Sequence, residues 1–228
     1  MKSKAINALF VLGIVALISA PVLAGPTGPA YQVSMSGSGY GFSGLNGGAF
    51  TATPLNGGAD WSDLSIGAPF LTFCAEPNVM GFGGWATIDN EIYFAGSYPN
   101  GVAVPASVRN VLARWFTEGY AGVGLTNDAT GNMLLQAFVW KEIYGTLPNT
   151  AWNTFYTTNA LLLSNLETMY GTAHARAGDI RVMNLWTSAT LFDGTTDRQS
   201  QFVIVPAPAA LLLGLMGLST AARLRRKA

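Results

Sequence analysis

The sequence predicts an α+β domain, an antiparallel β-sandwich or barrel with a helical insertion, framed by an N-terminal signal peptide and a C-terminal transmembrane helix. Three observations predict this architecture. Strand-like segments flank a middle part whose apolar residues follow helical spacing instead. The order of strands, helices and strands is typical of helices inserted into an antiparallel sheet. Each end of the chain carries an uncharged apolar block next to basic residues.

The N-terminus has the three parts of a secretory signal peptide. Two lysines precede an apolar run that extends to about Ser19, and the small residues Ala24 and Gly25 follow. We place the cleavage between Ala24 and Gly25, so that signal peptidase removes residues 1–24. An uncleaved membrane anchor is the alternative reading, but the apolar run is short for a membrane span.

The first part of the mature chain predicts strands joined by glycine-rich turns. Residues 30–36 alternate between apolar and polar, the pattern of a half-buried strand. Residues 69–75 form a short apolar run that predicts a buried strand, and residues 86–94 predict another strand with an internal turn. The tetrapeptide Leu-Asn-Gly-Gly occurs at 45–48 and again at 55–58, which indicates two hairpin turns.

The middle of the chain predicts amphipathic helices. The first begins with Ser107 as N-cap, carries an apolar stripe from Val108 to Phe116, and ends at Gly119 or Gly122.

A second predicted helix starts after Asn127 or Asp128 and runs to Tyr144, where Gly145 ends it. A third runs from about 159 to 170, with Thr158 as N-cap. After the helices, two further segments predict strands that return to the sheet, residues 180–186 and 201–205. The mature extracytoplasmic domain is therefore expected to span residues 25–202.

The charge distribution argues against a nucleic-acid partner. The formal net charge of the chain is zero, but half of its twelve basic residues lie in the two terminal blocks, whereas all twelve acidic residues lie between them. A nucleic-acid-binding surface is basic, because its cations displace counterions from the phosphates. One cysteine, Cys74, and one histidine, His174, leave little material for a transition-metal site, and no cofactor is expected.

The C-terminus resembles a known sorting signal. A Val-Pro-Ala-Pro block is followed by an uncharged Leu/Gly-rich stretch at about 209–222 and by a basic end at 223–227. This order resembles the PEP-CTERM signal of Gram-negative, polysaccharide-producing bacteria, with Ala207 where that family usually has Glu. The resemblance covers residues 203–228 and rests on Val205, Pro206, Pro208, Arg223, Arg225 and Arg226. It implies a transient anchor in the inner membrane, an exosortase-type protease as partner, and a final place at the cell surface or in the extracellular polysaccharide matrix.

Two short motifs in the core resemble a second family. Phe73-Cys74 lies on a predicted strand, and Gln136 lies four residues before Trp140 on the second predicted helix. This pair resembles the thioester domains of surface adhesins, in which an aromatic-Cys motif and a Gln-x-x-x-Trp helix cooperate. The resemblance implies that Cys74 and Gln136 form an internal thioester, with Phe73 and Trp140 lining its pocket.

The residues themselves are compatible with that chemistry. A thiolate held against a side-chain carboxamide can displace ammonia and leave an acyl thioester, provided that donors stabilise the oxyanion and water is excluded. Such a bond acylates amines, and Lys141 is the only lysine between the two processed ends. The function expected is therefore that of a non-enzymatic exported protein attached covalently to a surface amine.

Two alternatives remain open at this stage. Cys74 is also consistent with an ordinary buried residue, since free Cys commonly packs as a small hydrophobe, and the protein would then be a passive structural or carbohydrate-associated envelope module. The other alternative is a secreted hydrolase with Cys74 as nucleophile and His174 as base.

Overall fold

The computed structural model describes residues 28–37, 47–64, 66, 69–77, 83–94, 100–170, 172–192 and 197–205. Both expected processing signals lie outside these ranges, except for the first three residues of the C-terminal one. The predicted cleavage at Ala24-Gly25 and the sorting-motif residues from Pro206 onward are therefore not described. Among the described residues, no helix is both long enough and apolar enough to cross a membrane.

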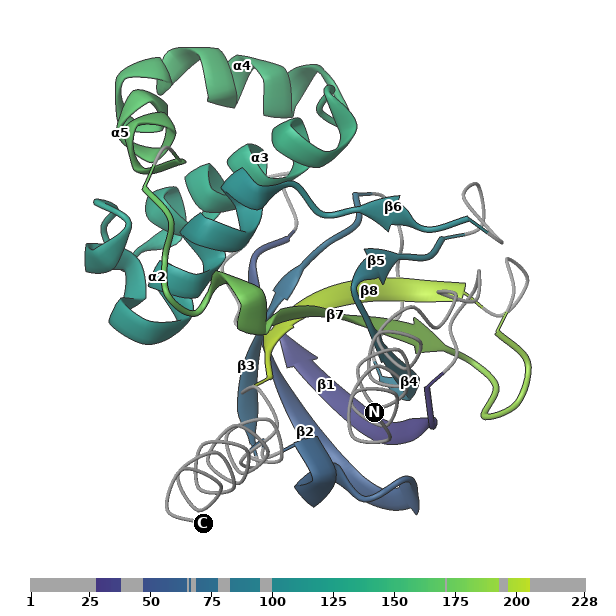
Figure 1. The fold of residues 1–228 in the computed structure, drawn as a ribbon. Helices are drawn as coiled ribbons and strands as arrows, with labels where there is room; N and C mark the ends of the chain where they lie inside the picture. The colour runs from purple at the N-terminus through teal and green to yellow at the C-terminus, as the bar shows by residue number, and fades with distance from the viewer. Residues whose placement is uncertain are drawn as a thin grey trace, which may run out of the picture.

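Within the described residues, the fold is α+β, and six strands close into an antiparallel barrel in the order β1-β2-β3-β8-β7-β4 (Figure 1). The barrel strands are β1 (Tyr31–Gly37), β2 (Ala49–Gly58), β3 (Phe70–Cys74), β4 (Gly84–Asp89), β7 (Ile180–Trp186) and β8 (Asp197–Ile204). Because β1 also pairs with β4, the barrel has no free sheet edge that could pair with another chain. The sequence left sandwich and barrel open, and the structure decides for the barrel.

The helical insertion lies between the two halves of the barrel in sequence. A two-stranded ribbon of β5 (Glu91–Ile92) and β6 (Val102–Ala103) leads into α2 (Ala106–Gly122), α3 (Ala129–Tyr144), α4 (Thr150–Thr158) and α5 (Ala160–Tyr170). Short 3₁₀ turns occur at Trp61–Leu64 and Ala177–Asp179. Figure 1 shows α2 and α3 next to one end of the barrel, with α4 and α5 outside them.

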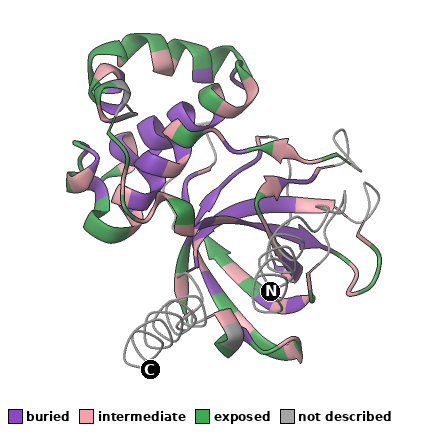
Figure 2. Cartoon of the chain, in the orientation of Figure 1, coloured by how far each residue is buried: buried purple, intermediate pink, exposed green. Residues whose placement is uncertain are grey.

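Two clusters of buried side chains fill the molecule, one on each face of the barrel sheet. Neighbouring residues such as Phe202 and Val203 fall into different clusters, because successive side chains of a strand point to opposite faces. The smaller cluster joins residues of β1, β2, β4, β7 and β8, so it occupies the barrel interior. The larger one packs β3 and β8 against α2, α3 and α5. Figure 2 shows this burial concentrated where the inner helices meet the barrel.

Some local predictions were wrong. Ser107 lies inside α2, and the N-cap of this helix is Pro105. The Ser107 hydroxyl instead donates a hydrogen bond to the Glu142 carboxylate of α3 at 2.7 Å. Thr158 ends α4, a helix that the sequence did not predict, and does not cap α5. The second Leu-Asn-Gly-Gly tetrapeptide belongs to β2, where Gly58 pairs with Tyr31, and is not a hairpin turn.

Candidate functional site

The centre of the site is α3, a helix that is buried on all sides along most of its length. Every residue from Gly131 to Trp140 is buried. Its ends are fixed as the sequence predicts: the Asp128 side chain accepts the Gly131 backbone N–H at 2.8 Å, and Gly145 adopts the left-handed conformation that ends the helix. Polar residues on such a helix need partners inside the protein, because no water reaches them.

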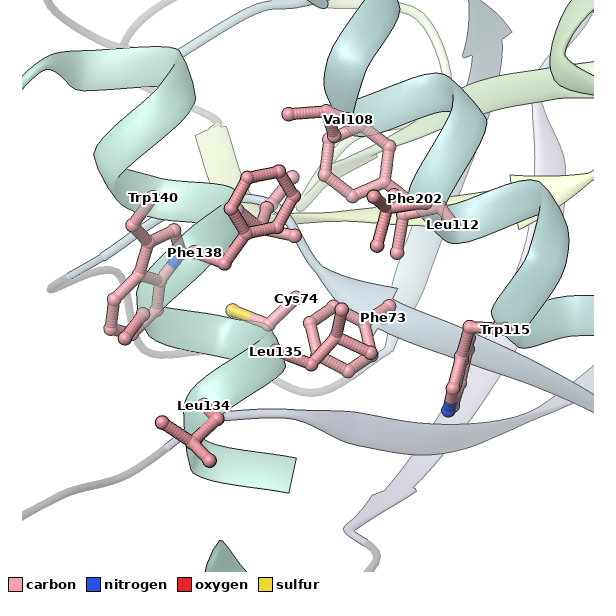
Figure 3. Close-up of a cluster of buried hydrophobic side chains, with 14 of the residues drawn as sticks. Phe73, Cys74, Val108, Leu112, Trp115, Leu134, Leu135, Phe138, Trp140 and Phe202 are labelled. Atoms are coloured by element: carbon pink, nitrogen blue, oxygen red, sulfur yellow. The ribbon is translucent and has the colours of Figure 1, made fainter. Parts of the chain in front are cut away.

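Cys74 is the last residue of β3 and is fully buried. Its backbone N–H donates to the Gly48 carbonyl oxygen at 3.0 Å, which holds it beside the start of β2. Phe73 points to the neighbouring Trp115, with ring centroids 5.0 Å apart, and anchors the strand against α2. In Figure 3 the Cys74 sulfur points from β3 toward the helix that carries Leu135, Phe138 and Trp140.

The Gln136 side chain is hydrogen-bonded to the Cys74 backbone, both directly and through Gly48, although 62 positions separate the two residues in sequence. The Gln136 Nε2 donates to the Cys74 carbonyl oxygen at 3.0 Å, and the Gly48 N–H donates to the Gln136 Oε1 at 2.6 Å. Gly48 thus binds Cys74 with its carbonyl and Gln136 with its N–H. The carboxamide is fully buried, and both of its ends have a partner.

Glycine is required at the point where the three residues meet. Gly48 has a φ of +106°, and a Cβ added there would lie 2.0 Å from the Asn132 Nδ2. Asn132, one helical turn before Gln136, accepts the Ala49 N–H at 3.1 Å and the Tyr120 hydroxyl at 2.8 Å. The same face of α3 therefore holds two consecutive backbone N–H groups of the segment that enters β2.

Trp140 is buried next to Gln136 and packs against the same backbone segment. Its ring packs edge-on against Trp152, with centroids 4.9 Å apart, and lies against Gly47, where an added Cβ would be 3.2 Å from the Trp140 ring. The same Cβ would be 3.0 Å from the Gln136 Cγ. The indole and the carboxamide therefore pack against one backbone segment, as the shared helix face predicts.

The sulfur itself has partners that the sequence analysis did not identify. The Gln199 Nε2 on β8 lies 2.9 Å from the Cys74 Sγ, and the Glu76 backbone oxygen lies 3.3 Å from it. Burial raises the pKa of the Cys74 thiol, and its contacts with the Glu76 backbone and the Gln199 side chain only partly offset this rise. In this arrangement the sulfur is a protonated thiol rather than a thiolate.

The residue whose backbone oxygen contacts the sulfur also carries a buried carboxyl group. Glu76 is 1 % exposed, its Oε2 accepts the Ser200 N–H, and its Oε1 has no hydrogen-bond partner. Burial, followed by the nearby Asp197, raises the pKa of Glu76 to about 8. Tyr144 of α3 donates to the Ala75 carbonyl oxygen at 3.2 Å, and burial together with Glu76 raises the pKa of its phenol.

One sequence signal could have identified Glu76. It follows Cys74 by two positions, and residues two apart on an extended chain point to the same side. Gln199 gives no comparable signal, because only the register of β3 against β8 brings it to the sulfur.

His174 belongs to a different part of the structure. Its Nε2 lies 3.6 Å from the Glu118 carboxylate, and its Nδ1 accepts the Arg176 backbone N–H. The His174 backbone N–H donates to the Asn110 side chain. Cys74 makes its contacts with Glu76 and Gln199 instead. The structure therefore does not bring together the nucleophile and base that the hydrolase alternative requires.

Lys141 lies outside the buried cluster. It is the last-turn lysine of α3, and its Nζ donates to the Gly145 carbonyl oxygen at 2.7 Å on the surface. Within the ranges that the structure covers, no three His, Cys, Asp or Glu side chains are grouped as a metal site needs.

Comparison with known proteins adds no identification: no family model, no curated protein and no solved structure matches the chain.

Proposed function

We propose that this is an exported surface protein that binds covalently to amines through an internal thioester between Cys74 and Gln136. The observation that supports the proposal is the position of the Gln136 carboxamide, which is buried, hydrogen-bonded to the Cys74 backbone, and polarised at its oxygen by the Gly48 N–H. The resemblance of the Phe73-Cys74 and Gln136–Trp140 motifs to adhesin thioester domains supports the same function.

Thioester formation replaces one bond of the carboxamide. The Cys74 sulfur attacks the Gln136 Cδ, the carbonyl oxygen becomes an oxyanion, and the C–N bond breaks to release ammonia. The Gly48 N–H lies 2.6 Å from that oxygen and is fixed by the backbone, so it stabilises the developing charge without reorganisation. For the attack, the sulfur turns from its contacts with Gln199 and Glu76 to the carbonyl carbon.

Burial protects the product. Cys74 and Gln136 are both 0 % exposed, and Phe73 and Trp140 are buried beside them. A thioester is an activated acyl group that water hydrolyses, so a dry site lengthens its lifetime. An amine that reaches the carbonyl carbon displaces the sulfur and forms an amide, which leaves the protein attached to the surface that supplied the amine.

The two carboxamides near Cys74 suit different roles. Gln199 directs Nε2, a hydrogen-bond donor, at the sulfur, an arrangement that stabilises negative charge there. Gln136 places its carbonyl oxygen on a backbone donor, as an acyl group under attack requires. We therefore assign the acyl partner to Gln136 and the sulfur donor to Gln199.

The setting of this chemistry follows from the two ends of the chain. A signal peptide delivers the protein across the inner membrane, and an exosortase-type protease processes the PEP-CTERM-like tail. The core then reaches the cell surface or the polysaccharide matrix, where amines on other macromolecules are available. The acidic core carries a single lysine of its own, which limits reaction with neighbouring copies.

Intact mass spectrometry of the mature protein tests the proposal. A thioester lowers the mass by one ammonia and prevents alkylation of Cys74 in denaturant at mildly acidic pH. Gln136→Ala should restore an alkylatable thiol, whereas the matched variant Gln199→Ala should keep the loss of ammonia at least in part. Wild-type protein with full mass and a freely alkylated Cys74 would refute the thioester and leave Gln136 as a structural clamp between α3 and the barrel.

A further inference from the structure

The strongest unexplained feature near the proposed thioester is the Glu76 carboxyl group. It is buried, one of its oxygens has no hydrogen-bond partner, and its backbone oxygen touches the Cys74 sulfur. A buried carboxyl group is costly unless its polar atoms are satisfied. The hydrogen bond that its side chain accepts from the Ser200 N–H requires an oxygen but not an acid, because a carboxamide oxygen would accept it as well.

We propose that Glu76 is the acid–base group of the thioester, taking the proton of the Cys74 thiol when the bond forms and protonating the sulfur when an amine opens it. This role rests on the proposed function. Glu76 lies outside both motifs that identified Cys74 and Gln136.

The proton balance explains why such a group is needed. In formation, the Glu76 carboxylate accepts the S–H proton as sulfur attacks the Gln136 Cδ, and the same proton passes to the nitrogen that leaves as ammonia. In the reverse direction the carboxylate accepts a proton from the attacking amine and delivers it to the departing sulfur. Glu76 is a carboxylate at the start and end of both reactions, so no further reactant is consumed.

The surroundings of the sulfur make unassisted departure unfavourable. Burial disfavours the bare Cys74 thiolate, so a sulfur that leaves without a proton would be an unsolvated anion. General acid–base assistance removes that cost, and it is most effective when the pKa of the assisting group lies near the working pH. Glu76, with a pKa of about 8, is poised in that way.

Burial and the nearby Asp197 of β8 favour the protonated form of Glu76. Tyr144 of α3 and Cys74 of β3 also face it, but burial raises the pKa of both, so they are neutral in the range where Glu76 titrates. The neighbouring Ser200 N–H from β8 favours the carboxylate and limits the rise of the pKa. The balance leaves a carboxyl group that changes charge in the range where the reaction is measured.

Aminolysis by methylamine provides the test, with intact mass as readout and the rate expressed per concentration of unprotonated amine. For wild-type protein we expect this rate to rise with pH and level off above about 8, as Glu76 becomes a carboxylate. Glu76→Gln, which keeps the size of the side chain, should lose this inflection and slow the reaction on the order of 100-fold. Glu76→Asp should keep the inflection at a reduced rate, and the exposed control Glu142→Gln should match wild type.

Each outcome decides the matter. Loss of the inflection in folded Glu76→Gln protein, or an intact carboxamide in that variant, supports the role. A Glu76→Gln variant with complete loss of ammonia and the wild-type profile overturns it. If Glu76→Gln does not fold, the wild-type profile decides: a rate independent of pH from roughly 6 to roughly 10 overturns the role. Wild-type protein with full mass instead refutes the thioester itself, a result that is distinguishable because no aminolysis then occurs.

Discussion

Opening the proposed bond with methylamine should destabilise the folded protein by an amount that its position in the chain determines. A Cys74–Gln136 thioester would link residues 62 positions apart, as a cross-link that restricts the unfolded chain. For a loop of that length, the chain-entropy relation used for disulfides gives about 4 kcal/mol of stabilisation. Methylamine removes this constraint and leaves the fold otherwise bonded as before, with the methylamide in place of the thioester.

Urea unfolding before and after treatment measures the effect. For a domain of this size the free energy of unfolding falls by about 2 kcal/mol per molar urea, so the midpoint should decrease by about 2 M after treatment. The matched control is Cys74→Ser, which cannot form the bond and whose midpoint should not respond to methylamine. Equal midpoints for treated and untreated wild-type protein would refute the reasoning, because a covalent link of this span cannot be opened without changing the unfolded ensemble.

Three further predictions concern the same region. In the Cys74→Ser background, Gln136→Met should lower the free energy of unfolding by roughly 2–5 kcal/mol, because two buried backbone groups lose their partners. The control Lys141→Met on the same helix should lower it by under about 1 kcal/mol. Similar urea midpoints for the two variants would contradict the hydrogen bonds described. Because folding raises the pKa of Glu76 from 4.5 to about 8, its contribution to stability is greatest below about pH 4.5 and declines as pH rises toward 8. Glu76→Gln should flatten this part of the plot of stability against pH. A slope that this substitution leaves unchanged would contradict the raised pKa. Asp128→Ala should lower the urea midpoint by removing the N-cap of α3, and an unchanged midpoint would show that the cap contributes nothing.

The sequence was most informative where local and tertiary preferences agree. The strands at 31–37, 70–74 and 180–186 have the apolar patterns that predicted them, and α3 has both expected caps at Asp128 and Gly145. The change from strand to helix spacing predicted the insertion correctly, because the apolar residues of α2 are buried in the cluster that joins the helices to β3 and β8.

Predictions failed where tertiary pairing outweighs local preference. Residues 55–58 carry a strong turn signal, but they form an irregularity within β2, where the register against β1 shifts between Pro54 and Gly58, instead of a hairpin turn. Helix α4 is rich in Thr and Asn, which favour helices weakly, and it depends on one buried anchor, Trp152, together with the Asn149 cap.

The candidate site likewise contains residues that the sequence could identify and residues that it could not. Cys74, Gln136 and Trp140 could be selected because their spacing within two short motifs is local information. Gly48 and Gln199 could not be selected, since they reach the site only through the pairing of β2 and β8 with β3. Contacts that depend on strand register across long separations leave no pattern in a single sequence.

Locating the modified residue tests the central claim most directly. After reaction of the mature protein with methylamine, fragment-ion mass spectrometry of the peptide from α3 should place one methylamide on Gln136, with Cys74 released as a free thiol. Cys74→Ser protein should contain an unmodified carboxamide at the same position. A methylamide on Gln199, or no methylamide anywhere in the wild-type chain, would contradict a bond between Cys74 and Gln136.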